Sequence, residues 1–311
     1  MNPLKRSKYT LRGSEHTFAI KATGIVEAKT QAAKESTGIT IHNVDEIEST
    51  IVVNPNKYCG DIFRFSDFKE VVKRIVADCG IESYRFVRTD FRLDSYDPEH
   101  YKAFKKLNRY LLAALTVTYK IKNSYITYDM MTLKQKTQAI KGERFEAENY
   151  DRAAKSRQTE NHREPAQSRF ELRTMAKEWK RTYVKAEAET ENMELFKADL
   201  VETWFMRLDA ALNHLEEVQA LYNNTLEGTY RELKEEDRMR TITDFILWYQ
   251  DFIFTKKQLI DLYKRLDDTG ADPVEKASNH KKRYGIEFFS KADAKYAVAE
   301  IKRAILEFLE K

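Results

Sequence analysis

The segment FVRTDFRLD, residues 86–94, decides the fold. Its charged residues stand at every second position, at Arg88, Asp90, Arg92 and Asp94, and uncharged residues fill the positions between them. This period of two is typical of a β-strand, because successive side chains of a strand point to opposite faces of the sheet. The segment therefore predicts a strand with one apolar face and one charged face.

A second segment, residues 167–173, repeats the pattern with Arg169, Glu171 and Arg173 on one side. If the two strands pair, their carboxylates and guanidinium groups converge on one face of a sheet. Carboxylate oxygens bind hard divalent cations and guanidinium groups bind phosphate, so this face is a candidate site for a phosphate-bearing substrate. The pattern leaves open a second interpretation, in which the charges form a solvated, salt-bridged sheet face.

Shorter patterns around these segments predict further strands. They are expected at residues 16–23, 39–42 and 49–53, in a hairpin of 116–121 with 125–132 that turns at residues 122–124, and in a hairpin within 138–150 that turns at Lys141 and Gly142. The β-branched residues of these runs and the turn residues that follow them are the signals used.

Helices are expected at residues 25–34, 67–79 and 98–115. Asp67 and Glu70 have the spacing of a capping box, and Gly80 stands where the C-cap of the same helix is expected. Strands and helices in this order predict an α+β fold, a mainly antiparallel sheet with helices packed on one face and a polar opposite face.

Beyond about residue 186 no strand pattern remains. Helices are expected at residues 193–222, 242–254, 256–266 and 291–309, the last two beginning at capping residues Thr255 and Ser290. We place a domain boundary here. It divides the chain into a basic N-terminal arm (1–15), a sheet domain (16–185) and an all-helical C-terminal domain (186–311).

The composition limits the class of protein. Only 9 glycines and 5 prolines occur in 311 residues, which favours long helices over an all-β fold. The two cysteines, Cys59 and Cys79, match no disulfide scaffold. Because no apolar run has the length of a membrane span and no signal peptide is recognised, we expect a soluble cytoplasmic protein with no membrane partner.

The charge is unevenly distributed. The net charge is +4, and the first 14 residues hold four basic and no acidic residues. Residues 131–185 contain 14 basic and 8 acidic residues, a net +6. A basic stretch of this kind attracts a nucleic-acid backbone, although a solvated charged surface is an equal alternative.

Tyr150 lies within FEAENYDR, residues 145–152, at the end of an expected strand. A tyrosine hydroxyl beside a metal-bound phosphodiester can act as a covalent nucleophile, and Arg152 and Lys155 are close enough in sequence to favour its ionised form. The alternative is an ordinary, half-buried tyrosine, one of 17 in the chain.

Other chemistries have little support. The six histidines, at positions 16, 42, 100, 162, 214 and 280, form no HxH or HExxH pair. The chain also has no P-loop and no GxGxxG motif, which disfavours ATP-dependent and NAD-dependent functions.

Four short motifs, taken in order, resemble a known family. They are VNPNK at 53–57 before a long helix, RTD at 88–90 with Asp94, NYDR at 149–152, and RFE at 169–171. In this order and spacing the chain resembles the non-HUH (Rep_trans-like) rolling-circle replication initiators of Gram-positive plasmids. It equally resembles the relaxases of integrative conjugative elements built on the same domain. The resemblance spans about residues 16–185.

The resemblance implies an origin-specific DNA nicking and joining enzyme, an endonuclease with topoisomerase-like chemistry, that starts rolling-circle replication of a plasmid or mobile element. It implies Tyr150 as the nucleophile that forms a 5′-phosphotyrosine. It also implies a Mg²⁺ or Mn²⁺ site at Asp90 and Glu171, with Asp94 as a further ligand, and phosphate contacts from Arg88, Arg152, Lys155 and Arg169. Arg152 stands at the motif's lysine position, and Arg173 stands where a second acid often follows the last motif.

The implied partners are a single-stranded or hairpin DNA origin, a host helicase and polymerase, and a second copy of the chain in a homodimer. Two alternatives remain open for the function, a conjugative relaxase with the same chemistry and a non-catalytic DNA-binding protein. The helical domain is expected either to bind double-stranded DNA through residues 255–266 and the basic residues 281–283, or to serve packing and dimerisation.

Overall fold

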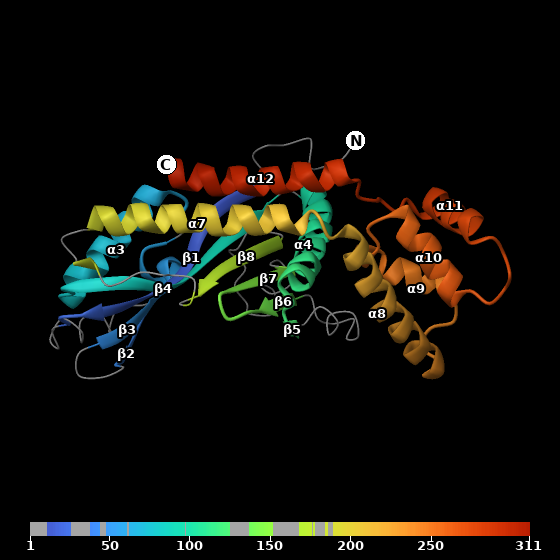
Figure 1. Ribbon diagram of the computed structural model, residues 1–311, viewed down its shortest axis with the longest axis horizontal. Coiled ribbons are helices and arrows are strands. Elements are labelled where there is room, and N and C mark those ends of the chain that lie inside the picture. The colour runs from blue at the N-terminus through green and yellow to red at the C-terminus, as the bar shows by residue number, and fades with distance from the viewer. Residues whose placement is uncertain are drawn as a thin grey trace.

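The computed structural model describes residues 11–25, 38–43, 48–60, 62–96, 98–124, 137–151, 168–175, 177, 184–185 and 189–311. Within these residues, nine antiparallel strands form one sheet in the order β2-β3-β1-β4-β8-β7-β6-β5, and β9 pairs with β4 outside this order (Figure 1). The strands are β1 (Leu11–Thr23), β2 (Ile39–Asn43), β3 (Glu48–Val53), β4 (Ser83–Ser95), β5 (Asn123–Ser124), β6 (Thr137–Lys141), β7 (Phe145–Asp151), β8 (Ser168–Met175) and β9 (Val184–Lys185).

The helices of the described residues follow and interrupt these strands. They are α2 (Pro55–Tyr58), α3 (Phe65–Cys79), α4 (Pro98–Tyr119), α7 (Glu189–Ala211), α8 (Leu215–Glu235), α9 (Ile242–Trp248), the 3₁₀ turn η3 (Gln250–Phe252), α10 (Lys256–Leu266), α11 (Pro273–Tyr284) and α12 (Lys291–Glu310). The α+β class predicted from the sequence is confirmed. None of these helices is long and apolar enough to cross a membrane.

The two charged segments pair directly, as β4 and β8. Their register places Asp90 opposite Arg173, Arg92 opposite Glu171 and Asp94 opposite Arg169. Residues directly opposite each other in an antiparallel pair point to the same side of the sheet, so both charged rows lie on one face. We call this side, with the residues of β7 that share it, the charged face.

The opposite face of the sheet is apolar and carries the core. Helix α12 packs along β1, and the ring centroid of Phe308 in α12 lies 5.1 Å from that of Phe91 in β4. Helix α7 supplies Phe196, whose ring centroid lies 5.1 Å from that of Phe86. Burial of each such ring stabilises the fold by about 1.5–3 kcal/mol. Both α7 and α12 lie beyond residue 186, so residues from either side of the predicted boundary share this core; the boundary itself stays a prediction.

Helix α8 leads away from the sheet to a smaller group of helices, α9, α10 and α11 (Figure 1). Thr255 caps α10 by accepting the amide of Gln258, and Ser290 and Asp293 form the expected capping box of α12. Helix α11 was not expected, although Asp272 caps its first turn and Gly285, at φ 67°, ends it.

Four expectations for element boundaries are wrong. Residues 116–119 of the strand expected at 116–121 form the last turn of α4, in which the hydroxyls of Thr116 and Thr118 donate to the carbonyls four residues earlier. These local bonds accommodate β-branched residues in a helix. The expected hairpin therefore does not form; Asn123 and Ser124 pair with β6 instead, and residues 125–132 lie outside the described residues.

The helix expected at 193–222 is broken after Ala211, where the amides of Leu212 and Asn213 bond three residues back and tighten the chain before α8 begins. The helix expected at 242–254 ends at Trp248 and continues as a 3₁₀ turn.

Asp67 does not cap α3, because the helix begins two residues earlier, at Phe65. The Phe65 ring stacks on Phe196 at 6.0 Å, and this packing extends the helix beyond the local signal. Gly80 ends the helix at φ 66°, as predicted. The helix expected at 25–34 lies almost wholly outside the described residues.

Candidate functional site

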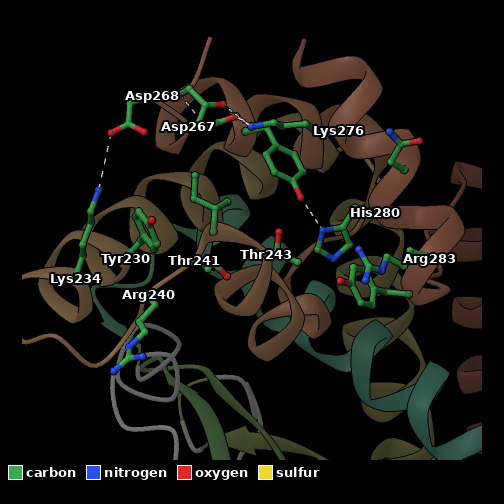
Figure 2. A pocket seen from close by; sticks show the side chains of 15 residues that line it. Tyr230, Lys234, Arg240, Thr241, Thr243, Asp267, Asp268, Lys276, His280 and Arg283 are labelled. Atoms are coloured by element: carbon green, nitrogen blue, oxygen red, sulfur yellow. Dashed lines mark hydrogen bonds and ion pairs between the residues drawn. The ribbon is translucent and has the colours of Figure 1, made fainter. Parts of the chain in front are cut away.

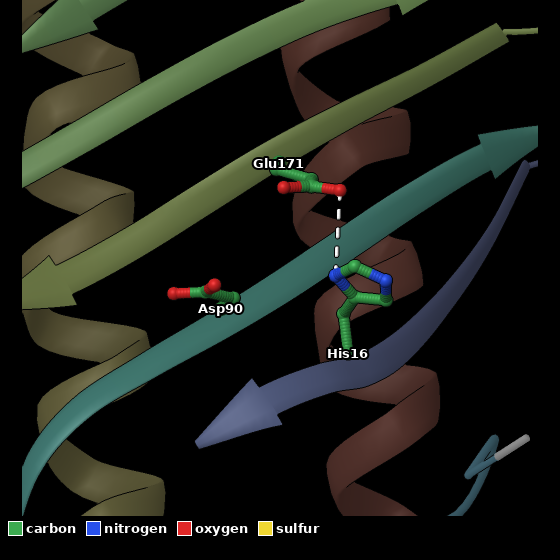
Figure 3. A group of neighbouring side chains, drawn as sticks. All are labelled: His16, Asp90 and Glu171. Carbon is green, nitrogen blue, oxygen red and sulfur yellow. Dashed lines mark ion pairs between the residues drawn. The ribbon is translucent and has the colours of Figure 1, made fainter. Parts of the chain in front are cut away.

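A β-bulge in β1 brings a histidine to the charged face. The pairing of β1 with β4 shifts register between Glu15 and Thr17, so His16 has no Cα partner on β4. An extra residue of this kind bends the strand and redirects a side chain. Donor atoms of His16, Asp90 and Glu171 then lie within 4.8 Å of one another (Figure 3).

The three side chains come from three neighbouring strands, β1, β4 and β8. Nδ1 of His16 lies 3.4 Å from Oε1 of Glu171. Asp90 and Glu171 are 1% and 2% exposed, whereas the His16 side chain is 24% exposed, so the histidine forms the open side of the group. One imidazole nitrogen and two carboxylate oxygens are a ligand set that suits Mn²⁺ and related divalent cations.

A buried carboxylate beside this group supports a cation there. The side chain of Glu15 is 0% exposed, and neither of its oxygens has a hydrogen-bond partner of good geometry among the described residues. Burial, and secondarily the charge of Asp90, hold the pKa of Glu15 well above its usual range. A raised pKa favours the neutral carboxyl, and a cation bound nearby would favour its ionised form instead.

Tyr150 is joined to the same group through Glu171. Its position on β7 is directly opposite Arg169 of β8, and its hydroxyl donates to Oε1 of Glu171 at 2.6 Å. The ring is 3% exposed. Burial, and then the charge of Glu171, raise the pKa of the Tyr150 hydroxyl, while the guanidinium of Arg169 acts in the opposite direction.

Glu171 has a low pKa despite its burial. Burial alone would raise its pKa, but the interactions with His16 and Arg173 outweigh this effect and lower the pKa of Glu171 to about 2, which favours the ionised form. Oε1 is therefore a charged acceptor that faces both the Tyr150 hydroxyl and His16.

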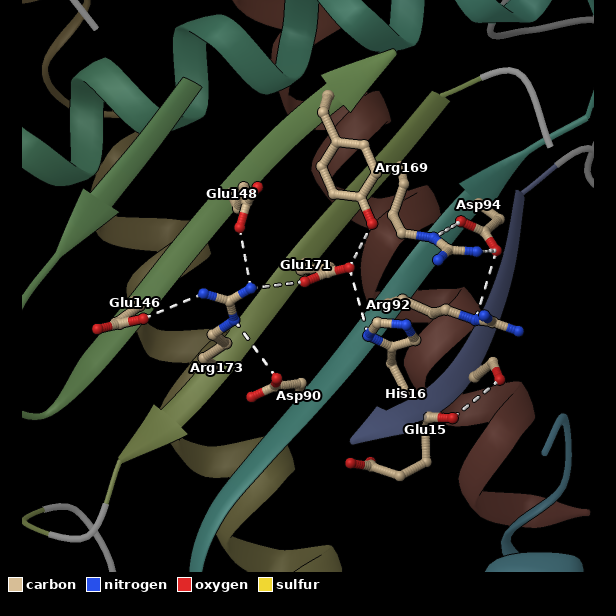
Figure 4. Close-up of polar contacts among 12 residues, drawn as sticks. Glu15, His16, Asp90, Arg92, Asp94, Glu146, Glu148, Arg169, Glu171 and Arg173 are labelled. Atoms are coloured by element: carbon tan, nitrogen blue, oxygen red, sulfur yellow. Dashed lines mark hydrogen bonds and ion pairs between the residues drawn. The ribbon is translucent and has the colours of Figure 1, made fainter. Parts of the chain in front are cut away.

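Arg173 connects the carboxylates of three strands (Figure 4). Its Nη2 lies 2.9 Å from both Glu171 and Glu148, its Nη1 lies 3.2 Å from Glu146, and its Nε lies 3.4 Å from Asp90. It fills the position where the family resemblance places a second acid. The guanidinium holds Glu171 and Asp90 in place from the side opposite His16.

Asp94 lies in a different set of contacts. Nε and Nη2 of Arg169 donate to its two oxygens at 2.6 and 2.8 Å, and Nε of Arg92 lies 3.4 Å away. Asp94 and Arg169 are 0% and 1% exposed. The two residues lie directly opposite each other in the β4–β8 register, which allows this bidentate pair. Asp94 is not part of the group formed by His16, Asp90 and Glu171.

Arg88 also binds a carboxylate, since its Nε donates to Asp90 at 2.8 Å. Burial raises the pKa of Asp90, and the bond from Arg88 opposes that rise. The other two predicted phosphate contacts, Arg152 and Lys155, lie outside the described residues.

The charged face is therefore not a solvated one. Its ion pairs join five carboxylates to four guanidinium groups, and most of these side chains are buried. Its members are Arg88, Asp90, Arg92, Asp94, Glu146, Glu148, Arg169, Glu171 and Arg173.

Sequence patterns missed His16 and Glu15. His16 is the first residue of the strand predicted at 16–23, and Glu15 is the last residue of the predicted arm, although both lie within β1. A bulge is defined by the partner strand and has no local signal here. The sequence therefore showed no reason to place either residue beside Asp90.

No family model matches the chain, and no curated protein matches its sequence. Among solved structures, the chain is similar to a rolling circle replication initiator protein from Geobacillus stearothermophilus. The two share 8% sequence identity and superpose with a TM-score of 0.31, over 60% of this chain and 78% of that chain.

Proposed function

We propose that this protein is a divalent-metal-dependent DNA nicking and joining enzyme that initiates rolling-circle replication of a plasmid or other mobile element. The observation that carries the proposal is the 2.6 Å contact of the Tyr150 hydroxyl with Oε1 of Glu171. That carboxylate also belongs to the group of His16, Asp90 and Glu171, whose spacing suits one cation. A nucleophile, a hydrogen-bond acceptor that orients it and a cation site thus adjoin on one sheet face.

His16, Asp90 and Glu171 would hold Mg²⁺ or Mn²⁺. Such a cation neutralises charge that develops on the phosphoryl oxygens of a phosphodiester. Asp94 is left out of this ligand set because Arg169 engages both of its oxygens.

Tyr150 would attack the phosphorus atom of one DNA phosphodiester. A bond forms between its phenolic oxygen and phosphorus, and the bond from phosphorus to the 3′ oxygen breaks. The phenolic proton passes to water while the Glu171 carboxylate orients the hydroxyl through its hydrogen bond, and the 3′ oxygen takes a proton from water. The products are a 5′-phosphotyrosine and a free 3′ hydroxyl that primes synthesis.

The surrounding charges support this chemistry. Arg169 lies against the Tyr150 hydroxyl and favours the phenolate, and Asp94 holds the guanidinium in that position. Because the phosphodiester energy is retained in the covalent intermediate, attack by a 3′ hydroxyl reseals the strand. Arg152 and Lys155 remain proposed phosphate contacts.

The substrate is a single strand, in an extruded origin hairpin or a melted origin. The backbone of a base-paired strand cannot enter a site whose tyrosine is buried. The ring of Tyr150 is 3% exposed, so the side chains that cover it must move when DNA binds. The nearest alternative is a conjugative relaxase, which performs the same reaction at a transfer origin.

The test is incubation of the protein with 5′- and 3′-labelled single-stranded oligonucleotides that carry candidate origins, with Mn²⁺. We expect a denaturant-resistant protein–DNA adduct with wild type and none with Tyr150→Phe. Tyr296→Phe, on α12, is the matched control and should retain the adduct. An adduct that persists in Tyr150→Phe would refute the nucleophile; no adduct with any origin would favour a DNA-binding protein without catalysis.

A further inference from the structure

A cavity of about 440 Å³, whose lining side chains are drawn in Figure 2, lies among α8, α9, α10 and α11. These helices lie apart from the sheet (Figure 1). The walls of the cavity come from α8, α9, α10 and α11 and from the segments that join α8 to α9 and α10 to α11. Small-molecule sites have volumes of about 300–1,000 Å³, so this cavity is of sufficient size. It does not take part in the nicking chemistry proposed above.

A buried histidine in the wall has one nitrogen without a partner. His280 is 3% exposed, and its Nδ1 lies 2.6 Å from the hydroxyl of Tyr263. Its Nε2 is buried and has no hydrogen-bond partner among the described residues. Since buried polar atoms normally have partners, this nitrogen indicates a group that the protein chain does not supply.

The bond to Tyr263 bears on which nitrogen of His280 carries the proton. We assign the Tyr263 hydroxyl as the donor and Nδ1 of His280 as the acceptor of this bond. Burial raises the pKa of the Tyr263 hydroxyl, so it stays protonated. His280 therefore carries hydrogen on Nε2, which is a donor that lacks an acceptor.

The charged residues around the cavity favour an anion. Lysines and arginines outnumber aspartates four to two in its lining. Lys276 is bound by Asp267, and Lys234 lies 4.0 Å from Asp268 (Figure 2). In the described part of the chain no carboxylate lies within ion-pair distance of the other two cations, Arg240 and Arg283.

Aromatic side chains line the same cavity. Tyr230, Tyr263 and Tyr284 contribute their rings, and Tyr284 is partly exposed. Arginine guanidinium groups bind phosphate, and tyrosine rings stack on nucleobases. A ligand that offers an anion, hydrogen-bond acceptors and a flat ring satisfies all three features of the lining.

We propose that this cavity binds a nucleotide, with its phosphate held by Arg240 and Arg283 and an acceptor atom placed against Nε2 of His280. The nucleotide is either free or one unit of a single-stranded DNA. Both sources offer the same phosphate and base, and the experiment separates them. The proposal does not rest on Tyr150, so either can fail alone.

The test is calorimetric titration of the full chain with dTMP, thymidine, inorganic phosphate and a ten-residue oligothymidylate, all in EDTA to exclude metal-dependent binding. We expect dTMP to bind at least tenfold more tightly than thymidine, and phosphate to compete with it. Arg240→Ala and Arg283→Ala should each weaken dTMP binding about tenfold. Arg231→Ala, an exposed arginine of α8 outside the cavity, is the matched control.

The variants also identify the source of the nucleotide. If Arg240→Ala and Arg283→Ala weaken the oligonucleotide and dTMP alike, the cavity holds one unit of a DNA strand; if they weaken dTMP alone, it holds a free nucleotide. His280→Phe should weaken dTMP binding as well, and circular dichroism checks that this variant folds. Equal binding of dTMP and thymidine, no dTMP binding at millimolar concentration, or binding unchanged in both arginine variants would overturn the proposal.

Discussion

The hydroxyl of Tyr150 donates to the same Glu171 oxygen that lies 3.4 Å from Nδ1 of His16. One carboxylate oxygen thus joins a tyrosine of β7 to a histidine of β1, across the two strands between them. This link connects the proposed nucleophile to the proposed cation site, so each can be tested through the other.

Removal of a proposed ligand should weaken Mn²⁺ binding without unfolding the chain. His16→Ala and Asp90→Asn are each expected to reduce the affinity by about tenfold or more, measured by electron paramagnetic resonance of free Mn²⁺. His42→Ala, at an exposed position of β2, is the control and should not change it. Affinities that match wild type in both variants would contradict the cation site.

Asp94 should contribute to the stability of the fold and not to the binding of the cation. Asp94→Asn leaves the buried guanidinium of Arg169 without its charged partner, which is expected to cost about 3–5 kcal/mol of unfolding free energy in urea. Glu216→Gln, which breaks an exposed pair with Lys257, should cost less than about 1 kcal/mol. If Asp94→Asn leaves stability unchanged and abolishes Mn²⁺ binding, Asp94 is a metal ligand after all.

Two glycine variants should have opposite effects. A Cβ on Gly13 would lie 2.5 Å from Cζ of Phe91 and 2.8 Å from the carbonyl of Ala304, so Gly13→Ala should push α12 from β1 and cost about 1–3 kcal/mol. Gly228, in α8, has no atom within 4 Å of such a Cβ, and Gly228→Ala should stabilise the helix by about 0.5–1 kcal/mol. Thermal unfolding of both variants checks this, and a stabilising Gly13→Ala would contradict the α12–β1 packing.

Lys106 should make stability depend on pH. Burial lowers its pKa to about 8, and its ammonium donates to the carbonyl of Glu287 at 2.7 Å. Below pH 8 both the folded and the unfolded protein carry the charge, and the folded state bears the full cost of burying it. Between pH 8 and the unfolded pKa of about 10.4 the folded protein loses this proton first, so the cost disappears as the pH rises.

Lys106→Met should therefore be more stable than wild type at pH 7, by up to about 3 kcal/mol, and this advantage should shrink toward pH 10. Urea unfolding at several pH values measures it, and Lys257→Met, at an exposed position, should show no such trend. An advantage that is constant with pH would mean that the charge of Lys106 is not the cause.

Local patterns predicted much of the fold, because they depend on residues close in sequence. The alternation in residues 86–94 predicts which side chains share a face. Ser290 and Asp293, three positions apart, predict the start of α12. The end of α4 misled the same reasoning, since Thr116 looks like a strand residue until its hydroxyl bonds to the carbonyl of Leu112.

The candidate site was predictable only in part. Tyr150, Asp90 and Glu171 lie in recognisable motifs. In the structure Tyr150 donates a hydrogen bond to Glu171, and Asp90 and Glu171 lie within one group. The bulge that adds His16 depends on how β1 pairs with β4, and the pairing of Asp94 with Arg169 depends on the β4–β8 register. Sequence alone specifies neither, because each is a relationship between distant strands.

The most direct test of the account is to locate the DNA on the protein. After reaction of wild type with a single-stranded origin oligonucleotide and Mn²⁺, proteolysis and mass spectrometry should find one nucleotide-bearing peptide. We expect it to be modified at Tyr150, to carry the DNA through a 5′ phosphate, and to be absent without divalent cation. Modification at any other residue, or through a 3′ phosphate, would contradict the account.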